Sequence, residues 1–421
     1  MSWIRKLFGL VKNADPTEDE DGQATLVVSG PAAPASPAGG LPRFSGLANE
    51  IEADRSYSRE LSAGHRLGRA YPVSQPVSDL RQFAGRRELL TSVIRSIEER
   101  RMHVVLYGDR GIGKTSLLHI IALLAKDARY LVRYSSCSAS SDLDGTFRAI
   151  AEDIPLLYHE KGDPTSAQVE SGKTLADLFD ASRLTPAALS EVLDGVSGTR
   201  VLIILDEFDR TEKPEFRREV AELIKNLSDR SSKVQILIGG VAENLSELVR
   251  QIPSIRRNLL GIPVGRMSDV ELAEILTNGQ AISGLPIDKV AQDRLIGSAN
   301  GSPYLANLIA HQASSRAIER GGKTVTAADL KDGLGMMARE QMLRLPERAQ
   351  QQVETLLAQV PHDQLRAAVG HALEHFGHVS LKQFPALKAM ADGKPVGDIS
   401  LAFEDDGVPL TIWLRLAELE N

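Results

Sequence analysis

The stretch GDRGIGKTS, from Gly108 to Ser116, follows directly on the apolar run HVVLY (103–107). Its glycines, lysine and threonine have the spacing G-x-x-x-x-G-K-T, and the helical pattern KTSLLHIIALLAK comes next. A phosphate-binding loop requires this order of strand, loop and helix. Glycines let the backbone approach phosphates with its N–H groups pointing inward, and the helix N-terminus adds a partial positive charge. The stretch therefore predicts a triphosphate site rather than a plain turn.

The side chains of this loop have separate expected roles. Lys114 should reach the β- and γ-phosphates, and Thr115 should offer its hydroxyl to Mg²⁺. The candidate nucleotide-binding residues of the loop are Gly108, Asp109, Arg110, Gly111, Ile112, Gly113, Lys114, Thr115 and Ser116.

A second stretch, VLIILDEFD (201–209), predicts the partner strand of the loop. Five apolar residues predict a buried strand that presents Asp206 at its carboxyl end, the edge where ligands gather in open α/β sheets. Asp206 should hold Mg²⁺, through water. Glu207 is the candidate for polarising the attacking water, and Asp209 for supporting the site. The alternative interpretation is an acidic pair that only caps the next helix.

Composition limits the class of protein. The chain has 421 residues, which predicts two or three domains, and a net charge of −7, which argues against a nucleic-acid surface along the whole chain. Cys137 is the only cysteine, so no internal disulfide is possible and a reducing compartment fits. No apolar run is long enough for a membrane-spanning helix. We expect a cytoplasmic protein.

The order of apolar runs predicts the fold class. Five strand candidates alternate with helical stretches, and their continuous apolar character indicates an α/β fold with a parallel sheet covered by helices on both faces. The candidates are 102–108, 130–136, 200–206, 234–240 and 258–264.

The motifs together resemble those of the AAA+ and STAND-type P-loop NTPases. The resemblance covers about residues 80–345 and is closest to a branch near the origin-recognition initiators and the prokaryotic STAND regulators. Its order of motifs is FAGRRELL (83–90), the phosphate loop, LDEFD (205–209), GGVAENLSEL (239–248), PSIRRNLLGIPVGRMSDVELAEIL (253–276) and GSPYLANLI (301–309).

This resemblance implies ATP bound between the sheet and a helical lid, with an extra strand between the two motif strands. It places Phe83 and Arg86 on the adenine side. Asn244 is the preferred candidate for a polar sensor, with Glu243 as the alternative. Arg256 or Arg257 would act as an arginine finger on a neighbouring subunit, or both are simply solvated.

The resemblance also has a departure. Where many AAA+ lids carry an arginine, GSPYLANL offers Tyr304. The loss of that arginine fits a slow nucleotide switch better than fast, ring-coupled hydrolysis.

We divide the chain into five segments on these patterns. The division is an amphipathic helix (1–14), a mostly disordered linker (15–77), a P-loop ATPase domain (78–267), a helical lid (268–344) and a winged-helix-like domain (345–421). In the last segment, GDISLAF-EDDG-VPLTIWL predicts a hairpin with Asp406 and Gly407 at its turn.

The expected partners follow from charge. Residues 1–14 have one apolar and one basic face, which suits a partner's groove, the inner face of a membrane, or packing on the protein itself. The segment 345–421 has eleven acidic and six basic side chains, a net charge of −5, so DNA is not favoured as its ligand.

The function we predict is a slow Mg²⁺-ATPase that acts as a nucleotide-dependent switch or assembly factor and forms a homo-oligomer on ATP binding. The alternatives are a DNA-binding initiator or loader that uses the winged helix, and a nucleotide-binding scaffold without hydrolysis.

Overall fold

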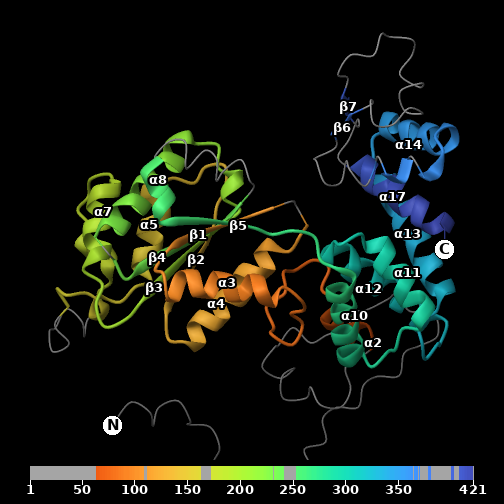
Figure 1. Cartoon of the computed structure of the whole chain (residues 1–421), viewed down its shortest axis with the longest axis horizontal. Coiled ribbons are helices and arrows are strands. Elements are labelled where there is room, and N and C mark those ends of the chain that lie inside the picture. Colours follow the sequence, from red (N-terminus) through yellow and green to blue (C-terminus); the bar gives the residue numbers. More distant parts are fainter. Residues whose placement is uncertain are drawn as a thin grey trace, which may run out of the picture. The chain divides into compact units, whose positions relative to one another are not determined.

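The computed structural model describes the greater part of the chain from residue 63 onward (Figure 1). Asp109, Arg110, Glu243, Asn244 and the expected N-terminal helix (1–14) lie outside the described residues. The described residues are 63–108, 111–162, 172–230, 232–240, 253–363, 365–367, 369, 378–380, 400–402 and 407–420.

A five-stranded parallel sheet forms the first half of the described fold, and its strand order is β2-β3-β4-β1-β5. All five strand candidates of the sequence are confirmed. Strand β4 separates β1 from β3, which is the extra strand expected between the two motif strands. The bounds are β1 His103–Tyr107, β2 Leu131–Ser136, β3 Val201–Asp206, β4 Val234–Gly240 and β5 Leu259–Pro263.

Helices cover both faces of this sheet (Figure 1), which is why its central strands are apolar at nearly every position. Helices α3 (Arg87–Glu98) and α4 (Lys114–Asp127) pack on one face, and α5 (Leu143–Glu152) and α8 (Pro214–Asp229) pack on the other. Alternate residues of the strands supply the two cores. Val104, Leu106, Leu202, Ile204 and Leu237 face α3 and α4, while Val105, Val201, Ile203, Leu205 and Ile236 face α5 and α8.

The residues between α5 and β3 form several short elements on the α8 side of the sheet. Helix α7 (Pro186–Asp194) is capped by Thr185, whose side chain accepts from the Ala188 N–H. The short 3₁₀ helices η2 (Leu156–Tyr158) and η3 (Leu175–Leu178) come before it. Their apolar side chains join the core beneath α5 and α8.

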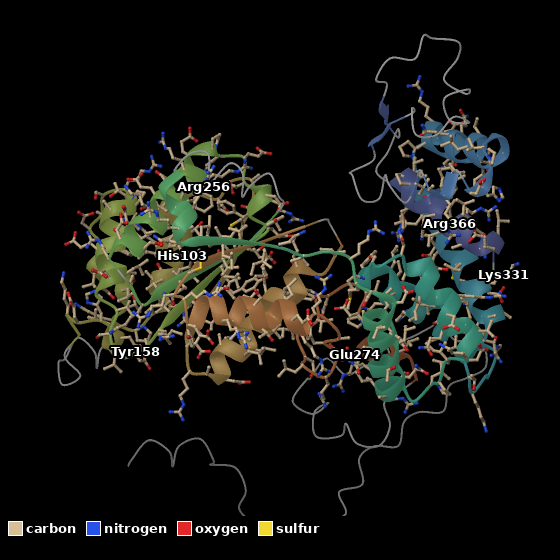
Figure 2. The ribbon with its side chains drawn as sticks, viewed as in Figure 1. His103, Tyr158, Arg256, Glu274, Lys331 and Arg366 are labelled. Atoms are coloured by element: carbon tan, nitrogen blue, oxygen red, sulfur yellow. The ribbon has the colours of Figure 1, made fainter. Side chains whose placement is uncertain are left out.

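Two buried polar side chains in the sheet domain have clear structural roles. His103 begins β1 (Figure 2). Its Nδ1 accepts a hydrogen bond of 3.0 Å from the Ile236 N–H of β4. Burial lowers the pKa of His103 to about 4, so it serves β4 as a neutral acceptor. Burial likewise raises the pKa of the Cys137 thiol to about 12, and Cys137 behaves as a small apolar residue.

The second half is helical. It contains α10 (Asp269–Ser283), α11 (Lys289–Ala299), α12 (Pro303–Glu319) and α13 (Ala327–Arg344). Side-chain caps begin two of these helices. Ser268 and Glu271 form a capping box on α10, and Ser302 caps α12 ahead of Pro303.

Residues 63–77 differ from the linker expected of them. They begin with helix α2 (Ala63–Ala70), which contacts α10 and α12, and Leu67 lies in the helical core. Tyr71 is fully buried against α10, where Gly279 leaves room for its ring. The prediction failed here because Leu67 and Tyr71, two large apolar residues among mostly polar ones, do not form a clear helical pattern.

The C-terminal segment corrects the predicted hairpin. Strand β7 (Ser400–Ala402) pairs antiparallel with β6 (His378–Ser380), and not with the residues that follow Gly407. Those residues form helix α17 (Gly407–Glu420). The stretch VPLTIWL fits a strand by its alternation, but its apolar residues also lie at helical spacing. Val408, Ile412, Trp413 and Leu416 are all buried. With α14 (Glu347–Gln359), this helix shares one core with α10–α13.

No helix in the described part of the chain combines the length and the apolar character needed to span a membrane.

The close fit of Tyr71 against Gly279 yields a test of how residues 63–77 dock. A Cβ at position 279 would lie 2.0 Å from Tyr71 Cε1. Gly279→Ala should therefore destabilise the protein by about 1–3 kcal/mol. In a Tyr71→Ala background the same change should cost almost nothing, since the ring it meets is gone. Urea unfolding of the four proteins measures this coupling, and equal costs in both backgrounds would contradict the docking.

Candidate functional site

A cavity of about 540 Å³ lies where the predicted motif residues meet. This is a typical volume for a small-molecule or cofactor site. The residues around it come from segments far apart in the sequence. They are Pro72–Val77, Gln82–Ala84, Arg86, Gly111–Ser116, Asp206, Glu207, Asp209, Arg210, Met267, Ile275, Pro303, Tyr304 and Asn307.

The loop that opens this cavity needs its glycines. Gly113 has φ +90°, a conformation that side chains other than glycine rarely adopt, and it stands directly before α4. At Gly108 a Cβ would lie 2.4 Å from the Val264 carbonyl oxygen, so a larger residue would push the loop away from β5. Lys114 Nζ donates to the Gly108 carbonyl oxygen at 2.8 Å, across the loop. Lys114 and the N-terminus of α4 therefore both face the space where phosphates would lie.

Asp206 ends β3 and faces the same cavity from the neighbouring motif strand. Its side chain is buried and its two oxygens have different partners. Oδ1 accepts from the Glu207 N–H at 2.8 Å, and Oδ2 accepts from the Tyr134 hydroxyl at 2.6 Å. The carboxylate is therefore oriented by hydrogen bonds from the protein itself.

Tyr134 was not predicted from the sequence. It lies on β2, where Ser136 pairs with Asp206 and Tyr134 pairs with Ile204, so both β2 side chains share the face of Asp206. Burial, and then the hydrogen bond to Asp206, raise the pKa of the Tyr134 hydroxyl, which keeps it a donor. His119 of α4 packs edge-on against the Tyr134 ring at 4.8 Å between centroids. The available signal in the sequence was the alternation along YSS (134–136), which places the side chains of Tyr134 and Ser136 on the same face of their strand.

Glu207 has an unusual backbone. Its φ is +53°, in the left-handed region that a residue with a side chain adopts at a cost in free energy. Its carboxylate oxygen Oε2 accepts from Ser136 Oγ at 3.0 Å and pairs with Arg210 Nη1 at 3.0 Å. Arg210, at the end of the 3₁₀ helix η4 (Phe208–Arg210), also lines the cavity. Neither Ser136 nor Arg210 was singled out in the sequence.

The FAGRRELL stretch lies on another side of the cavity. Phe83 and Arg86 both line it. Arg86 Nη2 donates to the carbonyl oxygens of Ile112 and Gly265, each at 2.8 Å, and its backbone N–H donates to Glu271 Oε1 at 2.6 Å. Burial lowers the pKa of the Arg86 guanidinium, an effect that Glu271 opposes. Arg86 thus connects the phosphate loop with the chain after β5 and with α10.

Residues 72–77 are a part of the cavity wall that sequence reasoning assigned to a linker. Tyr71 anchors this segment at one end in the helical core. At the other end the Val77 N–H donates to Ser116 Oγ at 3.1 Å, one residue after Thr115. The segment therefore contacts the phosphate loop directly.

The remaining predicted residues lie as follows. Tyr304, at the start of α12, lines the cavity opposite Gly111 and is 41% exposed. Arg256 (labelled in Figure 2) and Arg257 end the 3₁₀ helix η5 (Pro253–Arg257), which contacts α8, and both are exposed. Neither is among the residues that line the cavity. Asn244 could not be placed, because it lies outside the described residues.

The donor set of the cavity fits Mg²⁺. Thr115, Asp206, Glu207 and Asp209 present hydroxyl and carboxylate oxygens, the ligands that this hard cation prefers. Among the described residues, no group of three or more His, Cys, Asp or Glu side chains forms a ready-made metal cage. Mg²⁺ bound with a nucleotide does not need such a cage, since it takes one or two protein ligands and completes its shell with phosphates and water.

Comparison with known proteins assigns a family. The family model described as novel STAND NTPase 1 matches residues 76–377. Comparison with the curated proteins gives no match.

Comparison with solved structures gives several matches of low sequence identity. A variant of RuvB from Thermotoga maritima is 16% identical, with a TM-score of 0.44, over 80% of this chain and 96% of that one. The ORC2 protein of Aeropyrum pernix is 17% identical, with a TM-score of 0.45, over 78% and 86%. Cdc6p of Pyrobaculum aerophilum is 14% identical, with a TM-score of 0.47, over 84% and 98%.

Gly239 of β4 gives a test of the space around Asp206. A Cβ at this position would lie 2.7 Å from both Asp206 Oδ1 and Leu118 Cδ1. Gly239→Ala should destabilise the protein by about 1–3 kcal/mol and displace the carboxylate, which should weaken nucleotide binding in the presence of Mg²⁺. The matched control is Gly297→Ala in α11, where nothing lies within 4 Å of the added Cβ. Urea unfolding and nucleotide titration measure both effects, and wild-type values for Gly239→Ala would refute the described packing.

Proposed function

The chain belongs to the novel STAND NTPase 1 family, and on that premise we propose that it binds ATP with Mg²⁺, hydrolyses it slowly and acts as a nucleotide-dependent switch or assembly factor. One observation carries the proposal. Lys114 and Thr115 begin helix α4 after β1, Asp206 ends β3, which is not adjacent to β1, and all three line one cavity of suitable volume.

We assign the phosphates to the loop side of this cavity. Backbone N–H groups from Gly111 to Thr115 and the N-terminus of α4 would hold the phosphate oxygens, and Lys114 would exchange the Gly108 carbonyl for them. Thr115 and Asp206 would hold Mg²⁺, which supplies charge neutralisation on the phosphates when bound. The adenine would lie toward Phe83 and Arg86.

Hydrolysis requires a group that orients water, and Glu207 is the one we propose. Its carboxylate lies beside Asp206 at the cavity wall. Ser136 and Arg210 hold that carboxylate by one oxygen, so part of its accepting capacity is already used. This arrangement supports slow turnover, as does the presence of Tyr304 where many AAA+ lids carry an arginine.

A switch needs a ligand that contacts more than one segment. Besides the sheet residues, the cavity is lined by Met267 and Ile275, by Pro303 and Tyr304 of α12, and by the 72–77 segment. ATP in this cavity would touch all of them, and loss of its terminal phosphate would change which of these contacts are favourable.

Assembly on ATP binding is part of the proposal. Arg256 and Arg257 are exposed and do not line the cavity of their own chain, so an arginine-finger role would place one of them on the nucleotide of a neighbouring subunit. DNA binding is the alternative function, and the net charge of −5 over residues 345–421 disfavours it. Residues 1–14 are proposed to bind a protein partner or a membrane surface.

Lys114→Ala should abolish nucleotide binding. The variant lacks the ammonium group that neutralises the phosphates, while α4 should persist because alanine is a strong helix former. Titration calorimetry with ATP and Mg²⁺ measures the loss. Lys126→Ala, in the last turn of the same helix, is the matched control and should bind normally. Normal ATP binding by Lys114→Ala would contradict the assignment of the phosphate loop.

Glu207→Gln should separate a slow ATPase from a scaffold. We expect nearly normal ATP binding and a fall in turnover of about 100-fold or more, because the amide cannot accept a proton from water. Phosphate release under saturating ATP is the measurement. Glu212→Gln, on the loop before α8, is the control. A wild type that binds ATP without turnover would favour the scaffold, and a Glu207→Gln variant with unchanged turnover would contradict the role proposed for Glu207.

A further inference from the structure

Three cationic side chains are found among the described residues that line the cavity, and their partners differ. Arg86 donates to two backbone carbonyls, and Lys114 Nζ donates to a third. Arg210 instead pairs with Glu207, the side chain proposed to orient water. The partner of Arg210 is therefore a charged group of the same site, not a structural carbonyl.

The local backbone brings these two side chains together. Glu207 has φ +53°, and the Arg210 N–H donates to the Glu207 carbonyl oxygen at 2.9 Å, which closes the turn of η4. Phe208 between them is fully buried and fixes the turn to the core. Arg210 Nη1 and Glu207 Oε2 are 3.0 Å apart as a result.

This ion pair is easily exchanged. The Arg210 side chain is 56% exposed and that of Glu207 is 35% exposed, so water screens their attraction. A terminal phosphate offers more negative charge than a carboxylate, and it accepts two parallel N–H bonds from a guanidinium. A triphosphate in the cavity would therefore compete well for Arg210.

We propose that Arg210 leaves Glu207 for the terminal phosphate of ATP bound in its own chain. Arg210 then distinguishes a triphosphate from a diphosphate, and its departure frees Glu207 Oε2 from one of its two partners. The exchange would supply a positive charge at the terminal phosphate from within the same subunit. Tyr304 of the lid has no positive charge, and the exposed Arg256 and Arg257 do not line this cavity. The inference rests on the proposed function, because it requires ATP in this cavity.

The test compares affinities for ADP and for a non-hydrolysable ATP analogue, both with Mg²⁺, by titration calorimetry. Arg210→Gln should bind ADP within about twofold of the wild type and bind the analogue at least about tenfold more weakly. Arg210→Lys should recover part of the loss, since it keeps the charge but not the planar donor pair. Arg183→Gln removes another exposed arginine, one paired with Glu219 at 2.9 Å, and should match the wild type.

A second comparison excludes an indirect effect of Glu207. In Arg210→Gln the unpaired Glu207 carboxylate could itself repel the phosphate. The double variant Arg210→Gln/Glu207→Gln has no such carboxylate, so it is compared with Glu207→Gln alone. A loss of about tenfold that persists in the double variant supports direct contact between Arg210 and phosphate.

The outcomes are distinct. Equal preference for the analogue over ADP in Arg210→Gln and wild type overturns the inference while the proposed function stands. Equal preference in the double variant and Glu207→Gln also overturns it, because the effect then belongs to Glu207. If the wild type binds neither nucleotide, the proposed function fails and this inference fails with it.

Discussion

The site depends on the parallel pairing of β1 and β3 with the strand between them. Strand β4 pairs with both, with Tyr107 opposite Gly240 and Leu205 opposite Ile238, so the carboxyl ends of all three strands meet at one edge. A slip of one residue in β3 would turn Asp206 toward α5 and α8, since successive side chains point to opposite faces. The apolar side chains on both faces of β3 favour the observed register, because the same slip would move each of them into the core on the opposite face of the sheet. The meeting of Lys114 and Asp206 is therefore a consequence of sheet packing.

Around that edge, polar contacts prepare the side chains for a ligand. Tyr134 and the Glu207 N–H orient Asp206, while Ser136 and Arg210 hold Glu207. Buried or half-buried polar groups of this kind cost free energy unless they are paired. Their pairing within the site stabilises this cluster of charges, and it also supplies partners that a nucleotide would have to displace.

Much of this could be predicted from the sequence, for physical reasons that can be named. The strands could be predicted because burial on both faces requires continuous apolar runs. The phosphate loop could be predicted because Gly113 followed by Lys114, between a strand and a helix, is typical of few sites other than a phosphate-binding loop. The roles of Tyr134 and Arg210 could not be predicted, because they depend on the register of β2 against β3 and on the turn at Glu207. The segment 63–77 and helix α17 were mistaken because their burial comes from distant partners, such as Gly279 for Tyr71 and Ser298 for Trp413.

The most direct measurement is the dependence of ATP affinity on Mg²⁺ in wild type and in Asp206→Asn, obtained by titration with Mg²⁺ and with EDTA. If Lys114 and Asp206 serve one nucleotide, Mg²⁺ should tighten ATP binding in the wild type, and Asp206→Asn should lose most of that gain while its affinity in EDTA changes little. An Asp206→Asn variant that keeps the full effect of Mg²⁺ would contradict the central claim that the two motif strands build a single site.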